Sequence, residues 1–307
     1  MNINTEQLES DIIQQSQIFI NISSELHKVI VGQNNLIEKL LISLICNGHI
    51  LLEGVPGLAK TLTIKSLSQL LDTNYQRIQF TPDLLPADLI GTLIYNMKES
   101  KFEVKKGPIF TNIVLADEIN RSPAKVQSAL LEAMQERQVT IGEQSYKLDN
   151  PFLVMATQNP IEQEGTYPLP EAQVDRFMFK VIVEYPSKDE ELKILQTMSS
   201  LENKETIKPI INIKDINNSR KLVEQIHISE NIEKYIVSII NATRFPKQSG
   251  MNDLENLIAF GASPRGSIYL SIASKARAFM QKRSFVTPQD VRYVIKDVLR
   301  HRIILSY

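Results

Sequence analysis

The most informative stretch for chemistry is a glycine-bearing turn that ends in a lysine and a threonine. The turn follows the apolar run 50–52 and precedes a helical pattern, and its residues are Gly54, Val55, Pro56, Gly57, Leu58, Ala59, Lys60, Thr61 and Leu62. Glycines let backbone N–H groups point inward at an anion, while a lysine charge and a helix N-terminus add attraction. A hydroxyl directly after the lysine can bind Mg²⁺. The turn therefore predicts a phosphate-binding loop.

This loop departs from the usual pattern at one position. Glycine normally precedes the lysine, whereas Ala59 stands there in this sequence. A turn of this composition can also be a plain loop that binds nothing. The strand before it and the helix after it favour the phosphate-binding interpretation.

Two adjacent acids, Asp117 and Glu118, close the apolar run 113–116. An aspartate there can hold Mg²⁺ through water, and the neighbouring glutamate can polarise an attacking water. The alternative is a pair of solvated acids at the end of a strand. The phosphate loop upstream favours the catalytic interpretation.

Asn159 follows the next apolar run, 152–156, and precedes Pro160. An amide at this place can orient an attacking water between a glutamate and the terminal phosphate. An Asn-Pro pair is also a common way to open a loop. The residues alone leave both interpretations open.

Arg265 breaks a local rule of helix chemistry. It follows Ser263, which is placed to cap a helix, and Pro264, which suits the first turn. A cation there opposes the helix dipole at a cost of some tenths of a kcal/mol up to ~1 kcal/mol. Such a violation often marks a functional site, because a bound anion would reverse the sign of the cost. The alternative is an ion pair with a nearby carboxylate.

The elements that position these residues follow from the hydrophobic pattern. Between residues 31 and 186, short apolar runs alternate with helical patterns, which predicts an α/β core with a parallel sheet. The runs at 50–52, 113–116 and 152–156 are apolar at consecutive positions, as expected of strands covered on both faces.

The two ends of the chain are predicted to be helical. Residues 1–30 have the pattern of an amphipathic helix packed on the core. From Ser187, which forms a capping box with Glu190, strand signals vanish through residue 307. Within this part, 199–228 has weak periodicity and is predicted to be a connecting segment.

Two hairpins are predicted inside the core, at about 92–106 and 138–149. Both alternate apolar and polar residues around a short polar turn. They are interpreted as insertions in the core, and the alternative is that they are plain surface hairpins.

Composition limits the classes of partner and compartment. Lys and Arg number 34 against 35 for Asp and Glu, giving a formal net charge of -1. This balance provides no bulk electrostatic reason to expect nucleic acid or an acidic membrane. Cys46 is the only cysteine, the first twenty residues contain acids and no base, and no apolar run approaches the ~20 residues of a membrane span. A soluble, cytoplasmic protein is expected, and the four scattered histidines do not suggest a metal site.

In this order and spacing, the motifs resemble those of the MoxR-type ATPases of the AAA+ superfamily over nearly the whole chain. The further segments that carry the resemblance are Val31-Gly32-Gln33, which is similar to the family's adenine-side box, FTPDLLPADLIG at 80–91, DEINR at 117–121, LPEAQVDRF at 169–177, and GASPR at 261–265. The resemblance implies a P-loop NTPase (AAA+) core with a parallel sheet, followed by an all-helical lid domain, with ATP and Mg²⁺ as cofactors.

The resemblance also implies a role for each motif residue. Lys60 and Thr61 would bind phosphates and Mg²⁺, Asp117 would belong to the metal shell, and Glu118 would activate the catalytic water. Asn159 would be the sensor 1 residue. Val31, Gly32 and Gln33 would lie beside the adenine.

Three arginines are assigned by the same resemblance. Arg265 would be the sensor 2 residue, acting on its own nucleotide or on a neighbour's. Arg176 would be the arginine finger, which reaches the nucleotide of a neighbouring subunit in a ring, expected to be a hexamer. Arg121 is the less favoured candidate for that role. A finger supplied by a neighbour makes hydrolysis depend on assembly.

Three functions compete at this point. The leading one is ATP hydrolysis that drives chaperone-like remodelling or maturation of partner proteins, among which von Willebrand factor A domain proteins are expected by resemblance. The second is a nucleotide-switched scaffold without hydrolysis, against which the joint presence of Glu118, Asn159 and Arg176 argues. The third is a DNA-translocating motor or a metal-chelatase subunit. The near-neutral charge and the lack of an added DNA-binding motif argue against DNA, and the 80–91 segment argues against both.

Overall fold

The computed structural model describes residues 5–55, 57–160, 166–198 and 208–306 of the chain. Its centre is a five-stranded parallel sheet in the order β2-β5-β8-β1-β9. The strands are β1 (Ile50–Glu53), β2 (Tyr75–Gln79), β5 (Ile113–Asp117), β8 (Leu153–Gln158) and β9 (Phe179–Ile182). The predicted α/β fold with a parallel sheet is confirmed.

Both faces of the sheet are covered, which explains why its strands are apolar at consecutive positions. In β5, Ile113 and Leu115 belong to a buried cluster with the helices α2 (Asn34–Ile45) and α3 (Lys60–Leu70). Val114 and Ala116, which alternate with them, belong to a second cluster with α5 (Ala124–Glu136). Because successive side chains of a strand point to opposite faces, each face needs its own apolar partner.

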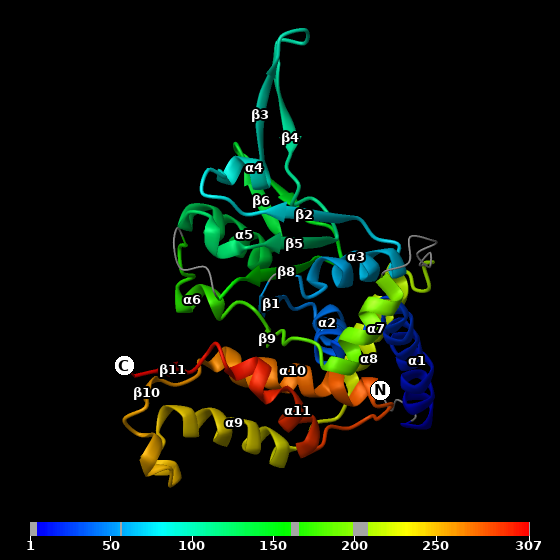
Figure 1. Cartoon of the computed structure of the whole chain (residues 1–307), viewed down its shortest axis with the longest axis vertical. Helices are drawn as coiled ribbons and strands as arrows, with labels where there is room; N and C mark the ends of the chain where they lie inside the picture. Colours follow the sequence, from blue (N-terminus) through cyan, green and yellow to red (C-terminus); the bar gives the residue numbers. More distant parts are fainter. Residues whose placement is uncertain (1–4, 56, 161–165, 199–207, 307) are drawn as a thin grey trace.

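The helical lid lies on one side of the sheet, as Figure 1 shows, and consists of α7 to α11. The helices are α7 (Lys188–Met198), α8 (Ile213–Gln225), α9 (Glu230–Arg244), α10 (Pro264–Met280) and α11 (Pro288–Leu299). Buried lid residues such as Leu270 and Val294 belong to the same apolar cluster as α2 and α3. The lid and the core therefore share one hydrophobic interior.

Two details of the lid differ from the sequence analysis. The segment expected to be a connection contains α8, which begins with a capping box between Asn212 and Asp215 (3.1 and 3.2 Å); residues 199–207 lie outside the described part. The buried residues of α8 are Ile216, Ser219 and Val223, and most of the helix is polar, so few apolar residues mark it in the sequence. A short antiparallel pair, β10 (Ile258–Phe260) with β11 (Ile304–Leu305), also accompanies the helices.

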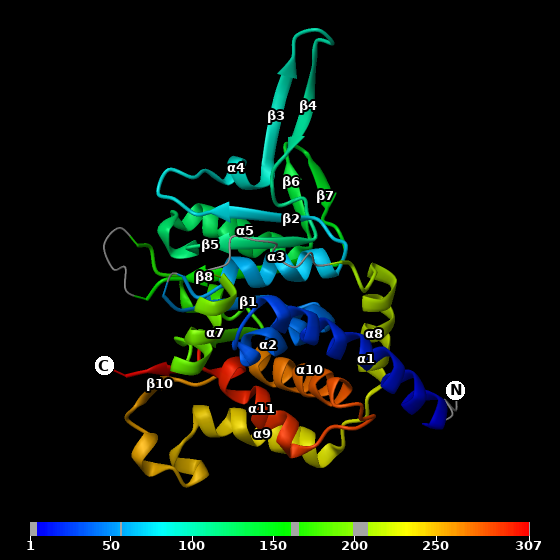
Figure 2. The same cartoon turned by 45° about the vertical axis from the view of Figure 1, so that its right-hand side comes forward.

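The first helix, α1 (Thr5–Val29), joins the core to the lid. It contacts α2 and α3 on one side and α8 and α10 on the other, as Figures 1 and 2 show. Phe19 is fully buried and meets Phe279 of α10 edge-on, with the ring centroids 5.9 Å apart. Within the described ranges, no helix has the length and apolar content required to cross a bilayer.

Two hairpins extend from the core. The longer one, β3 (Gly91–Asn96) with β4 (Lys101–Lys106), follows the short helix α4 (Pro86–Ile90) and projects away from the body (Figure 1). The second is β6 (Gln138–Ile141) with β7 (Gln144–Lys147). Gly91 has a φ of 101°, and a Cβ atom there would lie 2.2 Å from the Lys105 carbonyl oxygen, so the base of the long hairpin requires glycine.

Two buried histidines predict how stability depends on pH. Nδ1 of His49 accepts a hydrogen bond from the Val154 N–H (3.0 Å), and Nε2 of His301 lies 3.0 Å from the Phe177 carbonyl oxygen. Burial, with a smaller contribution from a nearby arginine, lowers the pKa of both well below the usual 6.5. The unfolded chain therefore binds protons that the folded chain does not. We expect the free energy of unfolding to fall as the pH drops below about 6.5, by up to about 1.4 kcal/mol per pH unit for each histidine.

Urea unfolding between pH 8 and pH 5 measures this slope. His301→Gln keeps an amide that can donate to the Phe177 carbonyl but cannot titrate, so its slope should be shallower by about 1.4 kcal/mol per pH unit. Equal slopes for the variant and the wild type would contradict the assignment.

Candidate functional site

A cavity of about 400 Å³ opens at the carboxyl ends of three neighbouring strands, β1, β8 and β5. Its lining joins the phosphate loop to the two acids and to the end of β8. The lining residues are Gly54, Gly57, Leu58, Ala59, Lys60, Thr61, Leu62, Arg77, Asp117, Glu118, Thr157, Gln158 and Asn159. The sheet order therefore brings together the residues that the sequence singled out in three separate segments.

The loop ends at the beginning of α3, where Lys60 is the first helical residue. Among the described residues, no side chain caps this helix end, so its first backbone N–H groups remain available to an anion. Nζ of Lys60 donates to the Gly54 carbonyl oxygen at 2.5 Å. Burial lowers the pKa of the Lys60 ammonium, while the charges of Asp117 and Glu118 oppose that shift. These donors fit a phosphate group.

The rest of the loop divides between the cavity and the core. Val55 packs against the apolar cluster, and Leu62 packs there while also lining the cavity. Pro56, which was also expected to bind nucleotide, lies outside the described residues.

Ala59, the departure from the usual loop pattern, adopts the conformation for which glycine is favoured. Its φ is 56° and its ψ is 12°, in the left-handed region. For a residue with a Cβ atom this conformation costs roughly 1–2 kcal/mol. The loop thus keeps the expected backbone geometry with a strained residue.

Replacing Ala59 by glycine should stabilise the protein. Ala59→Gly removes the left-handed strain from the folded state, while the freer unfolded chain offsets about 0.4–1 kcal/mol of that gain. We expect a net gain of up to about 1.6 kcal/mol in the free energy of unfolding. Urea unfolding measures it, with Ala129→Gly inside α5 as the control, because glycine in a helix interior should destabilise by about 1 kcal/mol. Destabilisation of Ala59→Gly as large as that of the control would contradict the assignment.

The hydroxyl of Thr157, at the end of β8, orders both acids. Its Oγ1 donates to Oδ1 of Asp117 at 2.7 Å and accepts the Glu118 backbone N–H at 2.8 Å. Glu118 itself has a φ of 55°, another left-handed residue at the site. Arg77 donates to the second carboxylate oxygen of Asp117 through Nε (3.1 Å) and Nη2 (2.5 Å), and this hydrogen bond raises the pKa of Arg77.

The carboxylate of Glu118 is held by two donors. Nε2 of Gln79 lies 2.8 Å and Nη1 of Arg121 lies 3.0 Å from its Oε2. Arg121, the less favoured finger candidate, thus contacts the acid of its own chain. Asn159 is 7% exposed and lines the same cavity.

A second cavity, of about 280 Å³, lies off the end of β9, the strand beside β1. Val31 and Gln33 line it, and Nε2 of Gln33 donates to the Glu184 carbonyl oxygen at 3.2 Å. Gly32 lies so close to the lid that an added Cβ atom would meet Glu190 at 2.5 Å. Arg300, at the end of α11, lines the cavity as well. Core and lid meet here.

Arg176 and Arg265 do not lie with Lys60. They line a third cavity, of about 210 Å³, together with Arg137 and Tyr269. Nη1 of Arg265 is 3.4 Å from Oδ2 of Asp175, so the alternative of an ion pair with a carboxylate is realised. Arg265 does not line the cavity that contains Lys60, and its contact with a nucleotide stays a prediction. Arg176 is half-buried, and its guanidinium has no side-chain partner among the described residues.

Sequence reasoning missed three residues of the first cavity or its support: Arg77, Gln79 and Thr157. Arg77 and Gln79 alternate with the buried Ile78 along β2, so a period-two pattern was present. It could not reveal that β2 lies beside β5, because strand order is not written in local sequence.

Comparison with known proteins agrees with this geometry. Residues 49–179 match the model of the ATPase family associated with various cellular activities (AAA), and residues 252–307 match the AAA lid domain. The chain is 49% identical over 283 residues to Chaperone MoxR1 of Mycobacterium tuberculosis, covering 92% of this chain and 74% of that protein. The chain belongs to the MoxR-type AAA+ ATPases.

Other relatives of this MoxR-type chain support the same assignment. Protein MoxR of Paracoccus denitrificans is 31% identical over 314 residues, covering 97% of this chain and 92% of that protein. A solved structure from Cytophaga hutchinsonii, described as a "putative ATPase", is 51% identical and superposes with a TM-score of 0.93. The match covers 100% of this chain and 93% of that one. The predicted family and the predicted core with a helical lid are confirmed.

Proposed function

We propose that this MoxR-type chain hydrolyses ATP in a Mg²⁺-dependent reaction and uses the cycle to remodel or mature partner proteins. The observation that carries the proposal is the single cavity that unites Lys60, Thr61, Asp117, Glu118 and Asn159. The relative named Chaperone MoxR1 supports the chaperone-like role.

The loop would bind the phosphates of ATP, and the second cavity would hold its adenine ring. Lys60 and the free N–H groups of α3 supply donors for the phosphate oxygens. Thr61 and Asp117 would hold Mg²⁺, which neutralises phosphate charge when bound. A carboxylate has about four lone-pair sites, and on Asp117 the described donors are Nε and Nη2 of Arg77 and Oγ1 of Thr157. One site therefore remains for a water of the metal shell.

Glu118 is the proposed general base. Gln79 and Arg121 fix its carboxylate, and Thr157 fixes its backbone. Glu118 would accept a proton from the attacking water, and Asn159 would orient that water with its amide. Held in this way, the carboxylate keeps its geometry without reorganisation during the reaction.

The two arginines of the third cavity would complete the site of a neighbouring subunit. Arg176 and Arg265 lie apart from Lys60, so they would act on a nucleotide bound by another copy of the chain. We propose a homo-oligomeric ring, with a hexamer as the expected size. The expected location is the cytoplasm, and proteins with a von Willebrand factor A domain are the expected partners.

Removing the proposed base should end turnover and spare binding. Glu118→Gln keeps the shape of the side chain but cannot accept the proton, so we expect the rate of phosphate release to fall roughly 10²–10⁴-fold. Binding of a fluorescent ATP analogue with Mg²⁺ should persist in the variant. Phosphate release at the wild-type rate would exclude Glu118 as the base, and negligible release by the wild type at high protein concentration would favour the non-hydrolysing scaffold.

The Thr157 hydroxyl should matter more for catalysis than for folding. Thr157→Val removes the group that orders both acids, and we expect kcat to fall roughly 10–100-fold, as for other groups that orient a metal ligand. Thr157→Ser retains the hydroxyl and is the matched control, for which kcat should stay within a few-fold of wild type. Steady-state ATPase assays decide, and equal losses in the two variants would refute the role of the hydroxyl.

A further inference from the structure

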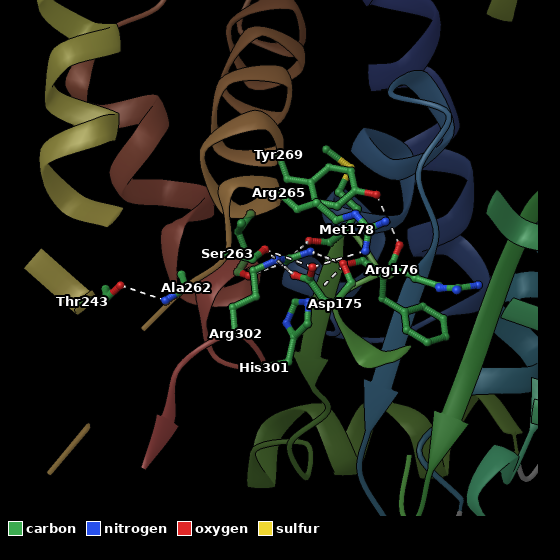
Figure 3. A network of polar contacts seen from close by, with 12 residues as sticks. Asp175, Arg176, Met178, Thr243, Ala262, Ser263, Arg265, Tyr269, His301 and Arg302 are labelled. Carbon is green, nitrogen blue, oxygen red and sulfur yellow. Dashed lines mark hydrogen bonds and ion pairs between the residues drawn. The ribbon is translucent and has the colours of Figure 1, made fainter. Parts of the chain in front are cut away.

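The segment that carries Arg176 is held by side chains of the lid. Four consecutive carbonyl groups, from Asp175 to Met178, accept hydrogen bonds from lid residues, as Figure 3 shows. Arg302 donates to the carbonyl oxygens of Asp175 (2.8 Å), Phe177 (2.7 Å) and Met178 (3.3 Å). The Tyr269 hydroxyl donates to the Arg176 carbonyl oxygen (3.3 Å). Thus the backbone of Arg176 and of the residues on each side of it is hydrogen-bonded to the lid.

The side chain of Asp175 ties the same segment to Arg265. Its Oδ1 accepts a hydrogen bond from Nε of Arg302 at 2.8 Å, and Nη1 of Arg265 lies 3.4 Å from its Oδ2. Ser263, at the start of α10, donates to the carboxylate at 3.0 and 3.1 Å. The Asp175 side chain is 15% exposed and that of Arg302 is 0% exposed. This carboxylate is therefore the anion shared by the buried Arg302 and by Arg265, whose side chain is 42% exposed.

Charge explains why one carboxylate at this place controls two arginines. Burial lowers the pKa of Arg302, the positive charge of Arg265 acts in the same direction, and Asp175 opposes both. Without the carboxylate, Arg302 and Arg265 would be neighbouring like charges with no shared anion, and they would repel each other. Asp175 thus keeps Arg265 beside the third cavity, which Arg176, the proposed arginine finger, also lines.

We infer that Asp175 is a positioning residue that, clamped by Arg302, fixes Arg176 and Arg265 in one unit with the lid and presents both to the nucleotide of the neighbouring subunit. This inference rests on the proposed function. The lid also lines the second cavity, where the adenine is proposed to bind, through Arg300, which lies two residues before Arg302. A lid movement that follows the chain's own nucleotide would then carry both arginines toward or away from the next site.

The variant Asp175→Asn tests the inference, since it keeps the shape of the side chain and removes its charge. We expect kcat to fall roughly 10–100-fold, the range for loss of a group that orients functional residues. Affinity for a fluorescent ATP analogue and the KM for ATP should stay within about twofold, because Asp175 lines neither nucleotide cavity of its own chain. A wild-type kcat would overturn the inference.

Mixing two impaired variants distinguishes a defect in placing the arginines at a neighbouring site from a general loss of structure in the variant subunit. An Asp175→Asn subunit retains its own Glu118, and a Glu118→Gln subunit retains a well-placed Arg176. In an equimolar mixture, random ring assembly places the intact Glu118 of an Asp175→Asn subunit beside the well-placed Arg176 of a Glu118→Gln subunit at about one interface in four. About a quarter of the wild-type rate should therefore return. Activity no greater than the sum of the separate variants would overturn the inference.

Two controls keep this result distinct from the proposed function. Arg176→Ala mixed with Glu118→Gln should recover the same fraction, and its failure to do so would refute the finger in trans itself. If that pair recovers and the Asp175→Asn pair does not, the positioning role alone fails. Asp290→Asn removes a comparable buried carboxylate, 2.6 Å from Arg283 within the lid, and should lower stability without changing kcat more than about twofold.

A milder variant covers the case in which Asp175→Asn does not fold. Ser263→Ala leaves the charge of Asp175 in place but removes its hydroxyl tether to α10. We expect a smaller fall in kcat that is likewise recovered by mixing with Glu118→Gln. A fall in kcat that mixing does not recover would count against positioning in trans.

Discussion

The site exists because parallel strands end at a common edge. β8 lies between β1 and β5, so the phosphate loop after β1 and the acids after β5 approach the end of β8 from its two sides. The Thr157 hydroxyl there donates to Asp117 and accepts from the Glu118 N–H. Burial of both sheet faces fixes the strand register, since a slip by one residue would exchange the two apolar clusters. The packing of the sheet therefore determines where the residues of the site lie relative to one another.

Charge is distributed so that one chain carries two incomplete halves of a site. The first cavity is lined by Asp117 and Glu118 together with Lys60 and Arg77, whereas the cavity around Arg176 and Arg265 is lined by arginines without a lining carboxylate among the described residues. In the proposed ring, a heterologous contact between copies would bring the two kinds of surface together. Each chain would then supply the general base and the metal ligands to its own nucleotide, and cations to the nucleotide of the next chain.

The sequence revealed what is local and not what is distant. Lys60 and Asp117 were recognisable because their chemistry lies in a few adjacent residues beside an apolar run. Arg77 was missed because its role depends on β2 lying beside β5. The partner of Arg265 is Asp175, ninety positions away, and no local pattern joins them. The helix α8 was missed because it is mostly polar and contains few apolar residues, and the pair β10–β11 because two or three residues give no periodicity.

The first helix has a mechanical consequence. At 1.5 Å per residue, the 25 residues of α1 form a rod roughly 38 Å long, and this rod packs on both the sheet layer and the lid. A swing of the lid about a free joint would strip one flank of α1 from its partners and expose Phe19 to water. Sliding of the lid helices along the rod keeps those contacts. The contacts of α1 with both layers therefore favour shear over a hinged swing for any movement of the lid.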